Sequence, residues 1–222
     1  MSKNREPLFR GEVDAMFNDA HFRLRDMLPS LKELSDHEIA AIFVRYTFVF
    51  HDHFTQWMTR AWVESTGDVR RILAQNLLCE IQDDHPELLL KLAHPAFFMV
   101  FGPHYCFQSF NDFFDLKNKA MRYAIEPMGV NPLYSLALLE GLSLKFIPWM
   151  KKAARKIKLS EQEYLEIHGV VDVKHAVAMK EAVVITMVDA TMQHGMLCEF
   201  QNSTKAVLYA LNWIFTGSAP SK

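Results

Sequence analysis

Residues 160–190 read SEQEYLEIHGVVDVKHAVAMKEAVVITMVDA. The stretch opens with Ser160-Glu-Gln-Glu163, the capping-box pattern in which the serine side chain and the glutamate satisfy each other's backbone N–H groups. Apolar residues then recur with helical rather than strand spacing. This pattern predicts one long helix that continues to about Ala190, and it favours an all-helical fold.

The rest of the chain has the same character. Ser35 and Glu38 form a second capping-box pattern, and Asn131-Pro132 is typical of a helix start. Alternation with strand period is scarce, and no Asn-Gly or Asp-Gly hairpin turn occurs. We therefore predict an all-α, single-domain bundle of about seven helices over residues 1–222, with a disordered tail at 217–222. The predicted helices cover 8–27, 35–65, 68–82, 104–126, 131–156, 160–190 and 196–215, and residues 86–99 are predicted to be irregular.

Composition excludes several classes of function. The chain has 222 residues, of which 50% are hydrophobic, and a net charge of −2. Without a basic excess, nucleic acid is not an expected partner. The basic residues between Lys151 and Lys158 are interpreted as a solvated helix end. No apolar run approaches the roughly 18 residues of a membrane span, and the N-terminus lacks a signal-peptide core, so we expect a cytoplasmic protein. Cys79, Cys106 and Cys198 lack metal-site spacing and are expected to be buried free thiols.

The chemistry is concentrated in His168, Asp172 and His175. Each residue turns a helix by about 100°, so offsets of 4 and 7 return to within about 40° of the starting direction. Two imidazoles and a carboxylate therefore lie on one stripe of a helix whose neighbouring residues are largely valine. Burying such groups is costly unless they are paired or bind a metal, and this donor set suits iron, manganese or zinc. A polar face directed at solvent is the alternative interpretation.

Two more carboxylates stand alone in apolar helical segments. Glu140 lies within LALLEGLSL (136–144) and Glu80 within NLLCEI (76–81). A buried carboxylate must be paired, protonated or bound to a cation. Three helices that each offer such groups favour one shared metal site. His51 and His53 cannot share one metal on a regular helix, because an offset of 2 separates them by about 160°, and we interpret them as structural or surface residues.

Together these residues resemble the heme-oxygenase-like diiron oxidases, a helical family related in fold to the thiaminase-II-type and pyrroloquinoline-quinone-synthase-type proteins. The family pattern is Glu, His, a later Glu, and then His-x3-Asp-x2-His. The resemblance covers about residues 35–195 and implies the ligand set Glu80, His85, Glu140, His168, Asp172 and His175. Residues 75–95 are also similar to the chlamydial death-domain-associating protein and its cyanobacterial relatives.

The chain departs from the family pattern at one place. Members usually carry a longer, glycine-rich insertion between the first Glu and its His, whereas only residues 81–84 intervene here. On a continuous helix an offset of 5 would place His85 about 140° from Glu80, so the helix must loosen before Pro86. Glu87, at offset 7 from Glu80, is a rival ligand, and His94 is a second one.

The resemblance implies that two Fe2+ ions activate O2 to oxidise a small carboxylate-bearing substrate, with Glu140 suited to bridge them. An amino acid is expected, with C–C cleavage, N-oxidation or nitrile formation in a biosynthetic pathway. A fatty acid undergoing oxidative decarboxylation is the alternative. Candidate substrate-binding residues are Tyr134, Phe101, Tyr105 and Lys145, and Arg122 is a further candidate partner for a carboxylate. Dimerisation through a helix face is compatible with the implied fold.

Other classes fit the sequence less well. A ferritin-like diiron protein needs Glu-x-x-His on two helices, a motif that this sequence lacks. A thiaminase-type hydrolase would use a cysteine nucleophile, and no cysteine here has a catalytic pattern with histidine. A metal-free helical interaction protein remains the non-enzymatic alternative.

Overall fold

The computed structural model describes residues 6–82, 84–102, 107–189 and 193–218, and within these ranges the chain is helical and contains no strand. The predicted all-α class is therefore confirmed. The helices, in order, are α1 (Glu6–Met27), α2 (Asp36–Phe50), α3 (Phe54–Glu64), α4 (Gly67–Gln82), α5 (His85–Phe101), α6 (Phe107–Ala120), the π-helical segment η1 (Met121–Ile125), α7 (Glu126–Gly129), α8 (Pro132–Lys156), α9 (Glu163–Asp189) and α10 (Gln193–Thr216).

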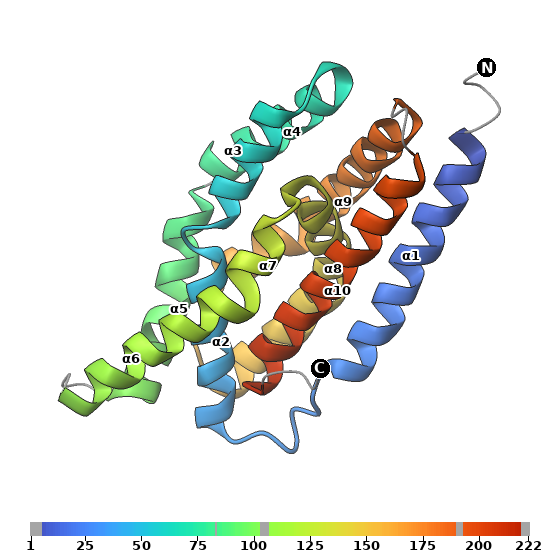
Figure 1. Cartoon of the computed structure of the whole chain (residues 1–222). Coiled ribbons are helices and arrows are strands. Elements are labelled where there is room, and N and C mark those ends of the chain that lie inside the picture. The colour runs from blue at the N-terminus through green and yellow to red at the C-terminus, as the bar shows by residue number, and fades with distance from the viewer. Residues whose placement is uncertain (1–5, 83, 103–106, 190–192, 219–222) are drawn as a thin grey trace.

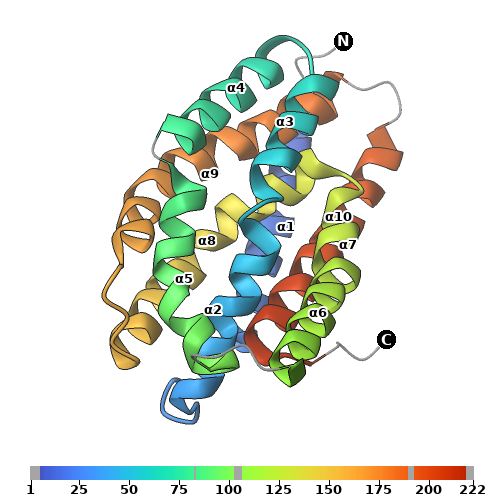
Figure 2. The same cartoon turned by 90° about the vertical axis from the view of Figure 1, so that its left-hand side faces the viewer.

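Helix α8 is the centre of the bundle. It packs against α1, α2, α3, α9 and α10, and Figures 1 and 2 show these helices surrounding it. Every residue from Pro132 to Ser143 is buried. Gly141 permits the closest approach, because a Cβ atom there would lie 2.6 Å from the Phe17 ring of α1. The part of α8 that carries Glu140 is thus enclosed on all sides.

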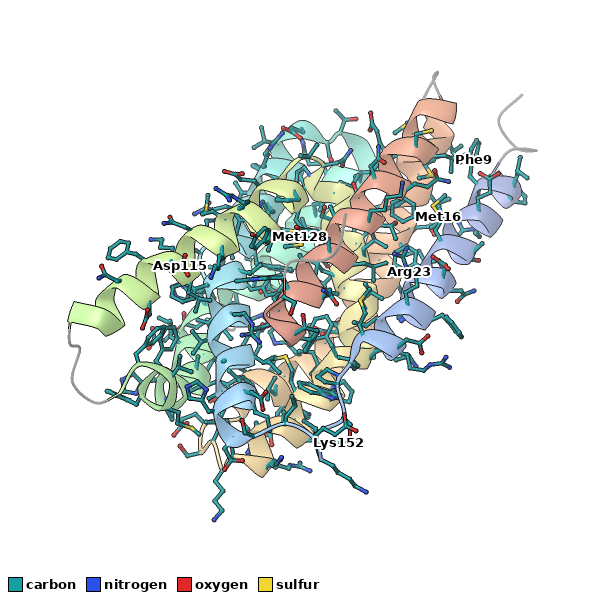
Figure 3. The ribbon with its side chains drawn as sticks, turned by 60° about the horizontal axis from the view of Figure 1, so that its bottom comes forward. Phe9, Met16, Arg23, Asp115, Met128 and Lys152 are labelled. Atoms are coloured by element: carbon teal, nitrogen blue, oxygen red, sulfur yellow. The ribbon has the colours of Figure 1, made fainter. Side chains whose placement is uncertain are left out.

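One hydrophobic core joins the helices. Its largest fully buried side chains include Phe43, Tyr134, Phe200 and Trp213, which come from α2, α8 and α10. Figure 3 shows Met128 among the helices and Lys152 projecting outward. No helix within the described ranges has the length and apolar character needed to cross a membrane.

The predicted helix over 35–65 is two helices. The Ser35 capping box forms as predicted: the Ser35 N–H donates to Glu38 Oε2 at 2.8 Å, and the Glu38 N–H donates to Ser35 Oγ at 3.3 Å. However, the chain turns at 51–53, where His51 pairs with Asp52 and His53 stacks on Trp57. Neither glycine nor proline marks this break, which explains why the prediction missed it.

The prediction that residues 86–99 are irregular is wrong, because α5 covers them. Pro86 lies in the first turn, where proline is tolerated. Pro95 lies inside the helix and leaves the Lys91 carbonyl without a helical donor. Lys91 is on the exposed side, where water can replace that donor. This extra helix and the break in 35–65 divide the chain into more helical segments than the seven predicted.

Two smaller expectations are also corrected. Helix α9 begins at Glu163 rather than after Ser160, because the side chain of Gln162 bonds instead to the Leu159 carbonyl and the Glu166 N–H donates to the Gln162 carbonyl. Among the cysteines, Cys79 is half-buried and Cys198 is exposed, so neither is the buried thiol expected. Cys106 lies outside the described residues.

Candidate metal centre

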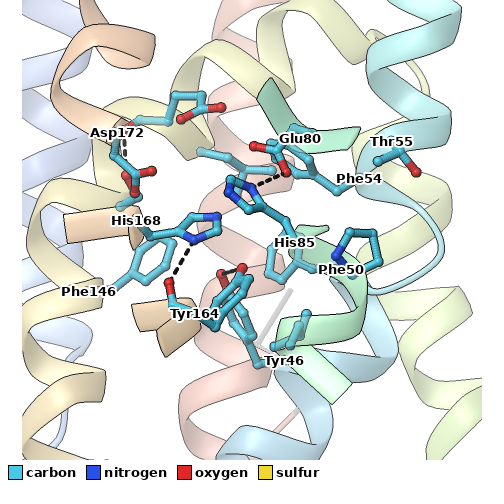
Figure 4. Close-up of a pocket in the computed structure, with 15 residues that line it drawn as sticks. Tyr46, Phe50, Phe54, Thr55, Glu80, His85, Phe146, Tyr164, His168 and Asp172 are labelled. Atoms are coloured by element: carbon cyan, nitrogen blue, oxygen red, sulfur yellow. Dashed lines mark hydrogen bonds and ion pairs between the residues drawn. The ribbon is translucent and has the colours of Figure 1, made fainter. Parts of the chain in front are cut away.

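Four helices bring all six expected ligands to one place (Figure 4). Glu80 continues the buried stripe Val69, Leu73 and Asn76 of α4. Two residues after α4 ends, Asp84 adopts the left-handed conformation (φ 51°, ψ 40°), and His85 begins α5. The break between α4 and α5, which continue in the same general direction (Figure 2), therefore brings His85 to the side of Glu80, which a continuous helix would not do.

The first group of possible ligands consists of Glu80, His85 and His168. Each offers one donor atom, and these atoms all lie within 4.8 Å of one another. His85 Nδ1 is 2.8 Å from Glu80 Oε2, and the His85 and His168 rings are 4.4 Å apart. Two imidazoles and one carboxylate are a donor set that holds a transition metal.

The second group consists of Glu80, Glu140 and His175, again with donor atoms within 4.8 Å of one another. His175 Nδ1 lies 3.6 Å from Glu140 Oε1. Glu80 is the residue common to both groups. Its carboxylate, which has two oxygens, is therefore placed to contact an ion in either group, a role that the sequence resemblance had implied for Glu140.

Asp172 lines the same cavity as Glu80, Glu140 and both histidines of the first group (Figure 4). Its side chain is buried, and its Oδ2 atom has no hydrogen-bond partner. Burial, followed by the negative charge of Glu140, raises the pKa of Asp172 to about 8. A carboxylate in such surroundings is stabilised either by a proton or by a cation.

The pKa shifts of the other candidate ligands are also those expected of groups that bind a cation. Burial raises the pKa of Glu140, and burial lowers the pKa of His168 to about 4. Burial also opposes charge on His175, but the Glu140 carboxylate 3.6 Å away, together with Cys79 and Glu80, outweighs burial and raises the His175 pKa to about 9. Glu140 Oε1 and His175 Nδ1 have no hydrogen-bond partner. Buried, under-satisfied donors of this kind fit metal ions better than they fit a structural role.

Neighbouring residues orient the ligands. His168 Nδ1 lies 2.9 Å from the Tyr164 carbonyl oxygen. A carbonyl can only accept, so Nδ1 carries the proton and Nε2 keeps its lone pair for a metal, as is usual for histidine ligands. The Tyr164 and Tyr46 hydroxyls, both buried, lie 3.1 Å apart. On α4, the Cys79 side chain is close enough to His175 to raise the pKa of that imidazole. Sequence reasoning missed these three residues, because a tyrosine or cysteine in an apolar segment looks like ordinary core.

A cavity of about 510 Å3, including its open mouth, adjoins the ligands. Its remaining lining is mainly aromatic and aliphatic, with two hydroxyl groups besides the tyrosines, and comprises Phe50, Phe54, Thr55, Pro86, Leu89, Leu139, Ser143 and Phe146. Where the structure describes its lining, the cavity has no lysine or arginine. A small organic molecule with an apolar body could approach the ligands here.

The rival ligands and most substrate candidates lie elsewhere. Glu87 and His94 are exposed on α5. Glu87 was predicted to share a helix face with Glu80 only if the helix were continuous, and the break at Asp84 interrupts it. Tyr134 packs on Phe200 and Phe101 on Phe113, both outside the cavity lining.

Lys145 is exposed and faces His21 of α1, so it also lies outside the cavity lining. Tyr105 lies outside the described residues. The structure therefore brings the six metal-ligand candidates together and does not bring the described substrate candidates to them.

No protein-family model matches the chain, and no curated protein or solved structure shows significant similarity to it.

Proposed function

We propose that the protein is a non-heme diiron oxidase that uses O2 to oxidise a small carboxylate-bearing molecule. The observation that carries this proposal is the position of Glu80, which belongs to both groups of buried ligands. Adjacent metal ions that share a carboxylate are typical of two-metal catalytic sites. The order of the ligands along the chain, as in the heme-oxygenase-like diiron oxidases, supports iron in preference to zinc.

Each residue has a distinct role in this proposal. Glu80, His85 and His168 hold one ion, and Glu140 and His175 hold the other together with Glu80. Asp172, on the cavity side, completes the second position. Two bound Fe2+ ions would supply the electrons and the open coordination positions that O2 activation needs. The aromatic wall of Phe50, Phe54 and Phe146 limits the access of water.

The cavity narrows the substrate class. Because no basic side chain lines the described wall, a substrate carboxylate would be neutralised at the metal ions themselves. The apolar wall fits an aromatic or aliphatic body. An amino acid in a biosynthetic pathway fits the ligand pattern. A fatty acid undergoing oxidative decarboxylation is the second candidate. One observation supports the fatty acid: the described wall has no acidic residue except the proposed ligands, so the amino group of an amino acid would have no other acidic partner.

Rapid mixing with O2 tests the proposal. The protein is loaded anaerobically with Fe2+, mixed with O2 and followed by visible absorption, with and without aromatic amino acids and medium-chain fatty acids. We expect a transient band whose formation one substrate class accelerates, and consumption of that substrate. Iron-loaded protein that leaves O2 and every candidate unchanged would contradict an oxidase.

A further inference from the structure

A second groove lies between η1 and α10, on the opposite side of the bundle from α4 and α5 (Figure 2). Six residues line it: Arg122, Tyr123, Pro127, Lys205, Ala206 and Tyr209. It has about 970 Å3 of space, including the part open to solvent. None of its lining residues is a ligand of the candidate metal centre.

The chain forms a π-helical turn at the edge of this groove. The Glu126 N–H donates to the Met121 carbonyl five residues earlier, which widens the helix by one residue. The widened turn seats Tyr123 against Tyr209 and Trp213 of α10, with ring centroids 6.1 and 6.3 Å apart. Single π-helical turns are rare and frequently occur at functional sites.

Both cations of the groove are uncommitted. Arg122 and Lys205 are exposed, and neither forms an ion pair with any part of the chain that the structure describes. No acidic residue lines the groove, although Glu126 is exposed nearby on α7. Two unpaired cations that line one groove repel each other, so an anion that contacts both would be stabilised. The concentration of positive charge is local, because the chain as a whole has a net charge of −2.

The chemistry of the groove selects the kind of anion. A guanidinium and an ammonium group together match the charge of a phosphomonoester, about −1.5 to −2 at pH 7. The half-buried rings of Tyr123 and Tyr209 offer apolar surface and phenolic hydroxyls next to those cations, which suits an aromatic ring attached to the phosphate. A long polyanion is disfavoured by the net negative charge of the rest of the chain. We propose that this groove binds a small aromatic phosphomonoester of the nucleoside monophosphate type.

Calorimetric titration of the full-length, metal-free protein with adenosine monophosphate tests the proposal independently of the iron chemistry. Inorganic phosphate and adenosine serve as the two partial probes. We expect adenosine monophosphate to bind more tightly than either and to weaken as salt is raised. Arg122→Gln and Lys205→Gln should each weaken it by about tenfold or more, because each removes a charge-assisted hydrogen bond.

Arg155→Gln is the matched control, since it removes one exposed positive charge from α8 outside the groove, and it should leave the affinity unchanged. Both groove substitutions are on exposed side chains, so the fold should survive, which circular dichroism can verify. Absence of binding, equal affinity for adenosine and its monophosphate, or equal loss in the Arg155 and Arg122 variants would overturn the proposal.

Discussion

Asp172 is the residue whose environment predicts a measurable dependence on pH. Its pKa is about 8 in the folded protein, against 3.8 for the free side chain. The folded state therefore binds more protons than the unfolded state between these values, and the stability of the metal-free protein falls as pH rises across that window. Burial lowers the pKa of His168 from 6.5 to about 4. Between these two values the unfolded state binds more protons at this residue, so His168 makes the stability rise with pH there.

The net fall should consequently be visible between pH 6.5 and 8, where His175, with a pKa of about 9, contributes to the same loss. We expect the urea midpoint of the chelator-treated protein to decrease over this interval, and Asp172→Asn to decrease less steeply. Parallel pH profiles for the two proteins would show that Asp172 does not titrate as its burial indicates.

The sequence was enough to predict the candidate metal ligands, but not the residues that surround and orient them. Glu80, Glu140 and Asp172 were predictable because an acid in an apolar helical segment is rare and demands a partner. Tyr46 and Tyr164 were not, because nothing distinguishes a hydrogen-bonded core tyrosine from an ordinary one. The valines beside the ligand stripe suggested a buried helix, but this was misleading, because the side chains of Val170 and Val177 are 70% and 68% exposed.

At the scale of elements, the break between α4 and α5 is the feature that assembles the site. Asp84 holds a left-handed conformation there, which costs a non-glycine residue about 1–2 kcal/mol, less for Asp or Asn. We expect Asp84→Gly to retain or slightly raise stability and Asp84→Val to lower it by about 1–2 kcal/mol, because a β-branched residue is strongly disfavoured at positive φ.

Urea unfolding measures both Asp84 variants, and metal titration shows the consequence for the site. The valine variant should also bind metal more weakly, because His85 directly follows the strained residue. If Asp84→Val and Asp84→Gly have the same stability and the same metal affinity, the left-handed conformation at Asp84 does not position His85.

Element boundaries were the weakest part of the sequence prediction, for local physical reasons. The break at 51–53 has no glycine or proline, and α5 contains two prolines that suggested irregular structure. The π-helical turn at Met121–Ile125 leaves the apolar spacing nearly unchanged. By contrast, the Ser35 helix start was predictable because both partners of its capping box are local.

For the whole molecule, the all-helical class followed from helical spacing throughout, whereas the packing order of the helices required contacts between distant segments. That order has a consequence for stability. The proposed ligands come from α4, α5, α8 and α9, so metal bound to the native state should stabilise the bundle as a unit. At a free metal concentration of about 100 times Kd the gain is about 2.7 kcal/mol.

Calorimetric melting with and without Fe2+ under anaerobic conditions measures this gain. We expect a single transition at a higher temperature with metal, and no shift for a variant that carries His168→Gln and His175→Gln. A metal-induced shift that persists in the double variant would assign the binding to surface groups.

The iron content of the protein shows whether Glu80 organises a two-metal centre. Anaerobic Fe2+ loading, removal of excess metal and elemental analysis should give about two irons per chain. Glu80→Ala should reduce this to less than one, because Glu80 belongs to both ligand groups, while Glu87→Ala, on the exposed side of α5, should retain both irons. Failure of the native chain to take up iron, or equal uptake by the Glu80 and Glu87 variants, would contradict the account.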